Sequence, residues 1–158
     1  MNYILDVLIM KSDFDKVDIS EQFKEWGGEK FPQNPIKYTY KSSLIFHENK
    51  DSYYQKTVGN IDIQNYVPLT LEGHQLTELE SLINDENSDI KNNELLLFLS
   101  ELYNVLDTFF VFIFRDEECI DEKYDIKNVK ELVEIFCNSL RRETPRGVLL
   151  IKNNKNEI

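Results

Sequence analysis

The six residues Phe109-Phe110-Val111-Phe112-Ile113-Phe114 form a long uninterrupted run of large apolar side chains. A helix that spans a membrane needs about 20 apolar residues, so this run is far too short to cross a bilayer. Its length and composition are instead typical of a buried β-strand. We therefore expect residues 109–114 to form a central strand of a sheet.

A second buried strand is predicted near the N-terminus. Residues 3–10 are apolar throughout except for Asp6, and they lack the basic lead and the small-residue cleavage site of a signal peptide. Cys119 and Cys137 are the two cysteines, and they form no disulfide framework. They are interpreted either as two buried free thiols or as a regulatory disulfide. With no export signal, the cytosol is the expected compartment.

Three segments have the apolar spacing of amphipathic helices. The first covers residues 76–83, and the second runs from Asn93 to about Leu106 and is apolar around more than half of its circumference. In the third, the predicted buried face consists of Val129, Leu132, Val133, Phe136 and Leu140. A shorter helix is expected after Asp18 or Ser20, with Ile19, Phe23 and Trp26 on one face and Gly27-Gly28 at its end.

The remaining strands are predicted from alternating polarity. Residues 36–63 indicate a hairpin in which Tyr38, Tyr40, Leu44 and Phe46 belong to one strand, 48–52 form the turn, and 54–63 return. Pro68 and Gly73 mark a boundary. An amphipathic strand at 119–126 is expected to form a second hairpin with 109–114. Residues 148–151 form a last short strand, followed by a frayed tail at 152–158.

These elements predict a single α+β domain over residues 1–158. Its sheet is largely antiparallel and is accompanied by about three to four helices, in an order of roughly β-α-β-β-α-α-β-β-α-β. A chain of 158 residues is long enough to bury a core without help from metals or disulfides.

The net charge of −11 is concentrated in one third of the chain. Residues 72–125 contain fifteen acidic and three basic residues, a net charge of −12, whereas the rest of the chain has a net charge of +1. Such a field repels nucleic acid and anionic membrane surfaces, and it accelerates encounters with basic proteins. A large net charge also keeps proteins dispersed in solution, so recognition and solubility both explain the pattern.

Known catalytic and metal-binding motifs do not match this sequence. His47 and His74 have no cysteine or histidine at ligand spacing, so neither a zinc site nor a catalytic role is predicted for them. The segment Asp85-x-Asn87-x-Asp89 begins like a calcium loop but has Ile90 and Leu96 at the positions of the required Gly and Glu. There is no glycine-rich phosphate-binding motif. We therefore predict no catalytic residue, metal or cofactor.

The acidic segment 116–122 is the most unusual local feature. It falls on a predicted exposed turn, where carboxylates lack the desolvation that acid–base catalysis requires. A solvated turn and a docking patch for a partner are the two interpretations. In the second interpretation, the predicted partner-binding residues are Asp116, Glu117, Glu118, Asp121 and Glu122, with a further group at Asp85, Glu86 and Asp89.

The acidic segments 84–89 and 116–122, together with the closing helix, turn and strand from Val129 to Ile151, resemble in general character the immunity proteins of bacterial toxin–immunity systems of the contact-dependent inhibition type. The resemblance implies a non-enzymatic protein that binds and blocks a cognate toxin, which is often a basic nuclease. Two alternatives stay open. One is an adaptor or structural subunit that uses helix 93–106, and the other is a hydrolase built on dispersed carboxylates.

Overall fold

Eight strands form one sheet in the computed structural model, which describes residues 4–22, 37–41, 44–48, 63–71, 73–84, 92–114, 120–141 and 147–153. The strand order is β2-β3-β4-β5-β1-β6-β8-β7. The strands are β1 (Ile4–Met10), β2 (Ile19–Gln22), β3 (Lys37–Tyr40), β4 (Leu44–Glu48), β5 (Tyr66–Leu71), β6 (Thr108–Phe114), β7 (Glu122–Asp125) and β8 (Val148–Asn153). Among the described strand pairs, β7 and β8 alone run parallel.

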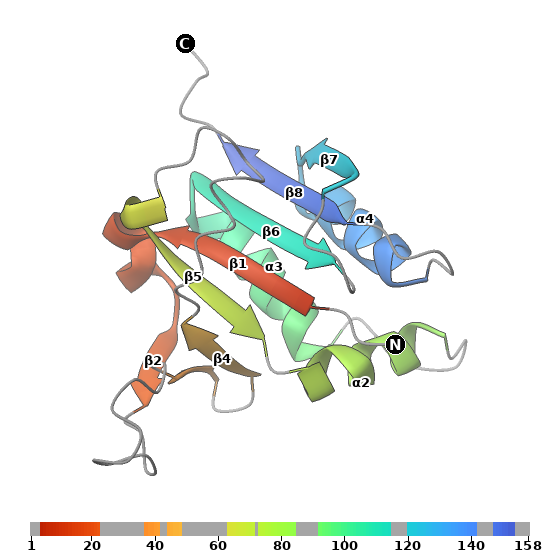
Figure 1. Cartoon of the computed structure of the whole chain (residues 1–158), viewed down its shortest axis with the longest axis horizontal. Coiled ribbons are helices and arrows are strands. Elements are labelled where there is room, and N and C mark those ends of the chain that lie inside the picture. The colour runs from red at the N-terminus through yellow and green to blue at the C-terminus, as the bar shows by residue number, and fades with distance from the viewer. Residues whose placement is uncertain are drawn as a thin grey trace.

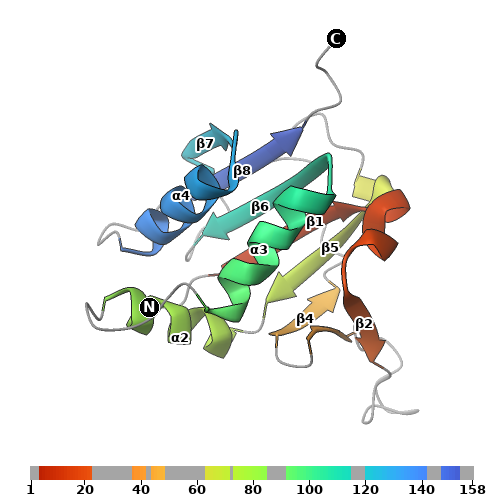
Figure 2. The same cartoon turned by 180° about the vertical axis from the view of Figure 1, so that it is seen from behind.

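Three α-helices cover the same face of this sheet, as Figures 1 and 2 show from opposite sides. They are α2 (Gly73–Ile83), α3 (Glu94–Val105) and α4 (Val129–Arg141), and two 3-10 helices, η1 (Lys11–Lys16) and η2 (Ile63–Asn65), lie between strands. The predicted α+β class and the largely antiparallel sheet are confirmed. None of the described helices combines the length and apolar character needed to cross a membrane.

β1 and β6 are neighbours in the middle of the sheet, paired from Ile4 opposite Phe114 to Ile9 opposite Phe109. Both were predicted to be buried strands, and both are. Leu5, Val7 and Ile9 face the helices, where they join a core that contains Phe98 of α3 and Phe136 of α4. Alternate side chains point to the other face of the sheet, because successive residues of a strand alternate in direction.

That other face also contains buried side chains, among them the apolar cluster of Leu8, Phe110, Phe112 and Leu149. Asp6 lies on the same face and is 0% exposed. Its carboxylate accepts a hydrogen bond of 2.5 Å from the Thr70 hydroxyl of β5. This bond offsets part of the cost of removing the carboxylate from water, which would otherwise be large.

Helix α3 is held at both ends. At its start, the Asn93 side chain accepts hydrogen bonds from the backbone N–H groups of Leu95 and Leu96, as an N-cap residue should. At its end, the Lys152 ammonium donates to the carbonyl of Tyr103 and lies 4.1 Å from the centre of the Tyr103 ring. These contacts fix the helix, and therefore the side chains it carries, against β8.

The Lys152 contact also corrects the predicted tail. Lys152 is 8% exposed and belongs to β8, which continues to Asn153 opposite Thr108. The prediction of a frayed tail is wrong for these two residues because pairing with β6 and the end of α3 hold them in place. Residues 154–158 lie outside the described part of the chain.

The predicted helix after Asp18 is wrong at its start. Ile19–Gln22 form β2, and each residue pairs with one of β3 from Ile19 opposite Tyr40 to Gln22 opposite Lys37. Ile19 packs against the helix-side core from this strand. Pairing with a neighbouring strand outweighs the weak local preference for a helix. Phe23, Trp26 and Gly27-Gly28 lie outside the described residues.

The first predicted hairpin has its turn in a different place. Residues 38–46 form two strands, with Tyr38 opposite Phe46 and Tyr40 opposite Leu44. The chain reverses after Tyr40, where Lys41 adopts a left-handed backbone conformation with φ of 51°. The next neighbour of β4 is β5, in which Pro68 lies opposite Leu8 of β1. This strand was not predicted. The proposed return strand falls largely outside the described residues, and Ile63 belongs to η2.

The second predicted hairpin is also wrong, although its two strands exist. β8 lies between β6 and β7, and β7 pairs with β8 in parallel at the edge of the sheet. β8 has three consecutive buried residues, Val148, Leu149 and Leu150. This burial suits a strand inside the sheet, between two neighbouring strands, better than one at its edge. β7 has half-buried and exposed residues in alternation, which suits an edge.

Candidate functional site

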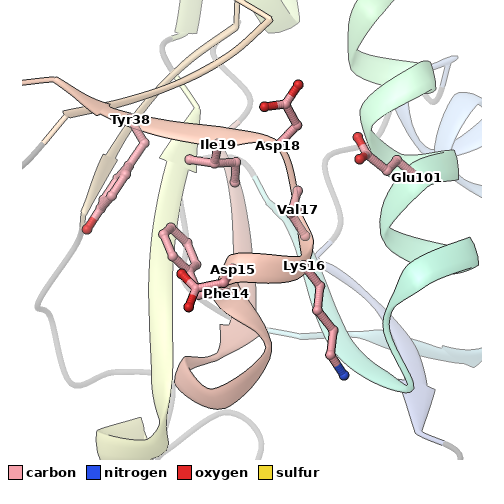
Figure 3. Close-up of a pocket in the computed structure, with 8 residues that line it drawn as sticks. All are labelled: Phe14, Asp15, Lys16, Val17, Asp18, Ile19, Tyr38 and Glu101. Atoms are coloured by element: carbon pink, nitrogen blue, oxygen red, sulfur yellow. The ribbon is translucent and has the colours of Figure 1, made fainter.

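A pocket of about 660 Å³ lies where η1 and β2 approach α3. Its volume is within the range typical of ligand sites. Its described lining consists of the segment from Phe14 to Ile19, Tyr38 of β3 and Glu101 of α3 (Figure 3). We call this the acidic pocket, because its lining contains the three carboxylates of Asp15, Asp18 and Glu101.

One wall of the acidic pocket is aromatic. The rings of Phe14 and Tyr38 meet edge to face, with centroids 5.2 Å apart and planes at 72°. The backbone around them is held by short-range bonds from the N–H of Val17 to the carbonyl of Phe14 and from the N–H of Ile19 to the carbonyl of Val17. The turn therefore places Phe14 against β3 and leaves Asp15 and Asp18 at the rim.

The charge of the pocket is negative. Lys16 is the one basic residue of its described lining, and its ammonium is 3.1 Å from the carboxylate of Asp13, which is not part of that lining. In Figure 3 the Lys16 side chain extends away from Asp18, whereas Glu101 extends from α3 toward the segment that carries Asp18. The carboxylates of Asp18 and Glu101 thus approach the pocket from two different elements.

The hydroxyl of the buried residue Tyr40 donates a hydrogen bond to the Glu101 carboxylate. Burial raises the pKa of Tyr40, and the hydrogen bond to Glu101 and the negative charges of Glu101, Asp18 and Glu94 raise it further. Tyr40 therefore stays neutral and acts as a donor. The other carboxylate oxygen of Glu101, Oε2, is buried and has no hydrogen-bond partner among the described residues.

The exposed side of α3 next to the pocket is apolar. Leu97 is 41% exposed and Val105 is 40% exposed, and they lie four residues before and four residues after Glu101. Residues four apart lie on the same face of a helix. Ile4 is the other large hydrophobic residue that is exposed within the described ranges. Two of these three exposed residues, Leu97 and Val105, therefore flank Glu101 on α3.

The predicted partner-binding residues are placed only in part. Asp121 is exposed, and its carboxylate accepts a hydrogen bond of 3.0 Å from the backbone N–H of Gly147. Glu122 is half-buried and accepts a hydrogen bond of 3.2 Å from the Tyr124 hydroxyl. Both carboxylates thus have partners within the chain. The other predicted residues lie outside the described part of the chain, so their role stays a prediction; they are Asp116, Glu117, Glu118, Asp85, Glu86 and Asp89.

A polar row crosses four strands on the face opposite the helices. Lys37 of β3 is opposite His47 of β4, His47 is opposite Thr70 of β5, and Thr70 is opposite Asp6 of β1. Because Asp6 is fully buried, its carboxylate cannot contact a substrate in this conformation. Within the described ranges there is no group of three His, Cys, Asp or Glu side chains that could hold a metal ion. His74 is the second residue of α2.

Cys137 of α4 is a free, buried thiol, as one of the two interpretations of the cysteines predicted. Burial raises its pKa, and the positive charge of Arg141 offsets this only partly. The thiolate is the reactive form of cysteine. Cys137 is therefore an inert core residue at neutral pH. Cys119 lies outside the described residues.

In a Cys119→Ser variant, where Cys137 is the only thiol, we expect alkylation by iodoacetamide at pH 7 to be at least about tenfold slower in the native protein than in urea. Because the folded protein holds the thiol proton more tightly than the unfolded chain, the free energy of unfolding should fall as the pH rises above the ordinary thiol pKa. Mass spectrometry over time gives the rate. Equal rates in the two conditions would show that Cys137 is accessible.

Comparisons of this chain with protein-family models, curated proteins and solved structures found no match. The chemistry of the acidic pocket and its apolar flanks is therefore the basis on which a role can be assigned.

Proposed function

We propose that the protein is a non-enzymatic binding protein that recognises a basic protein partner in the cytosol, and that this partner is a toxin which it neutralises. The observation that supports this role best is the combination of the acidic pocket with exposed Leu97 and Val105 on either side of Glu101. Protein interfaces commonly join an apolar centre to polar and charged groups that select the partner.

The charge distribution is consistent with such a partner. The net charge of −12 within residues 72–125 attracts basic proteins over long distances, and Asp15 and Asp18 add carboxylates from outside this range. The mechanism would be steric. The partner would bind over α3 and η1, and this protein would then cover the surface that the partner needs for its toxic activity.

The alternative role as an adaptor would use α3 as its docking helix. Most apolar residues of α3 are in the core, including Leu95, Leu96, Phe98, Leu99 and Leu102. The apolar part that stays exposed is Leu97 and Val105, on the same helix face as Glu101, which lines the acidic pocket. An adaptor and an inhibitor would therefore use the same surface, and they differ in whether binding blocks an activity of the partner.

The test is co-expression with the product of a neighbouring reading frame. That product alone should arrest growth, and this chain should relieve the arrest and form a stable complex. A Leu97→Ser/Val105→Ser variant should weaken the complex by at least about tenfold, because two buried apolar contacts are lost. Ile4→Ser is the matched control, since Ile4 is 39% exposed at the far end of β1 from η1.

Binding can be measured by calorimetry and protection by growth curves. If toxicity is unchanged by this chain, or if Ile4→Ser is as harmful as the double variant, the proposed function or its assigned surface is wrong. Turnover of a substrate by the purified protein would favour the hydrolase alternative instead.

A further inference from the structure

β7 is the last strand of the sheet, and within the described part of the chain its one neighbour is β8 (Figures 1 and 2). The backbone N–H groups of Glu122 and Ile126 donate hydrogen bonds to carbonyls just before and within β8. Because backbone groups alternate in direction along a strand, the N–H and C=O groups of Lys123 and Asp125 point away from β8. A sheet edge with outward-pointing groups of this kind can pair with another strand.

The exposed side chains along this edge alternate in charge. Asp121, Lys123, Asp125 and Lys127 are all exposed, and their charges are negative, positive, negative and positive in turn. These four charges cancel, although the chain as a whole has a net charge of −11. Opposite charges directly across a pair of strands are stabilising, whereas like charges are destabilising. The edge therefore suits a strand that carries the opposite charge at each of these positions.

A second copy of β7 meets this requirement. In an antiparallel pair centred on Tyr124, Lys123 of each copy would lie opposite Asp125 of the other, so the two-fold symmetry makes the contact twice. These would be the hydrogen-bonded pairs, since the backbone groups of both residues point outward. An antiparallel pair centred on Lys123 or on Asp125 would instead place like charges opposite each other. The charge pattern thus favours the register centred on Tyr124.

Tyr124 itself suits the centre of such an interface. Its side chain is half-buried and packs against the helix-side core, and its hydroxyl donates to Glu122. In this register the two tyrosines occupy the non-hydrogen-bonded position, where opposed side chains come closest. Aromatic pairs across two strands are stabilising, so the contact adds to that of the charges.

We infer that the protein forms a symmetric dimer in which the β7 strands of two copies pair antiparallel about Tyr124 and join the two sheets into one. The paired strands are short, so the interface is small and the dimer is weak and dependent on concentration. The inference does not rest on the proposed function. The acidic pocket lies beside β2 and β3, at the other end of the strand order, so each copy keeps its pocket open.

Sedimentation velocity from about 10 μM to about 1 mM protein measures this self-association. Lys123→Asp and Asp125→Lys should each weaken it by at least about tenfold, because each change turns two attractive pairs into two repulsive ones. A mixture of the two variants should associate, since every pair across the mixed interface then joins opposite charges. This recovery distinguishes a lost interface from a lost fold.

Lys11→Asp is the matched control. It makes the same change in net charge as Lys123→Asp, at an exposed residue of η1, which packs beside β1 and β5. It should associate as the unaltered protein does. A protein that stays monomeric at about 1 mM, an equal loss in the control, or a mixture that fails to associate would overturn the inference. A toxin complex without self-association removes the dimer alone, and self-association without any toxin complex removes the proposed function alone.

Discussion

Truncation of Phe136 to alanine is expected to lower the free energy of unfolding by about 3–5 kcal/mol. Phe136 is 0% exposed and belongs to the core between α4 and the sheet. Its removal forfeits the burial of a phenyl ring and leaves a cavity in a densely packed region. Since domains of this size have a total stability of about 5–15 kcal/mol, the variant should be close to unfolding at physiological temperature.

Urea denaturation followed by circular dichroism measures this change through the shift of the midpoint. Glu134→Ala is the control on the same helix, because Glu134 is exposed and its truncation should cost less than about 0.5 kcal/mol. A Phe136→Ala variant as stable as this control would mean that α4 does not pack on the sheet through the face that carries Leu132, Phe136 and Leu140.

The second large effect concerns the rate at which the partner binds. Reversal of Asp15, Asp18 and Glu101 to lysine should slow association by about a hundredfold at low salt, within the range known for electrostatic steering. Dissociation should also quicken, because basic groups of the partner are left desolvated without a counter-charge. The difference from the unaltered protein should shrink as salt rises, since screening limits the field to about 8 Å at physiological ionic strength.

The control must carry the same net charge. Reversal of Glu78, Asp125 and Glu134 meets this condition, because all three are exposed and none lines the acidic pocket. It should slow association only slightly. Reversal of Asp116, Glu117 and Glu118 tests the patch predicted from the sequence, and it should reduce mainly the association rate. Stopped-flow kinetics would show which surface steers the partner, and three equal effects would contradict a role for the pocket.

Elements with a dense or strongly periodic apolar pattern could be predicted from the sequence. β1 and β6 are short apolar runs, and α3 and α4 have clear helical spacing of apolar residues. The local apolar pattern is therefore enough to predict whether each segment is a strand or a helix. Residues 19–22 show the limit of this reasoning. They carry a weak helical pattern, but they pair with β3, and pairing between distant segments has no local signal.

The alternation of side-chain direction along a strand explains why the turn of the first hairpin was predicted in the wrong place. Tyr40 and Leu44 are four residues apart, so they keep the same parity whether the chain continues or reverses between them. An alternating pattern therefore cannot distinguish one long strand from a tight hairpin with a three-residue turn. Pro68 hid β5 for a different reason, because proline is rare inside strands that have neighbours on both sides.

The acidic pocket was not predicted because its parts are far apart in the sequence. Asp15 and Asp18 lie outside the acidic region of residues 72–125, and Glu101 is brought to them only by the packing of α3. One signal was present nonetheless. The predicted helix 93–106 has more apolar residues than one buried face can hold, and the surplus residues Leu97 and Val105 are exposed four residues before and after Glu101.

The position of β1 has a consequence for synthesis of the chain. Its two neighbours, β5 and β6, end at Leu71 and Phe114, so β1 leaves the ribosome long before either can pair with it. During this time Leu5 to Met10 is an unpaired apolar strand, the kind of segment that stacks with copies of itself. A single charge within such a segment opposes stacking, because identical charges would lie next to one another. We therefore expect the Asp6 carboxylate to oppose aggregation of the nascent chain, before it accepts the hydrogen bond from Thr70 in the folded sheet.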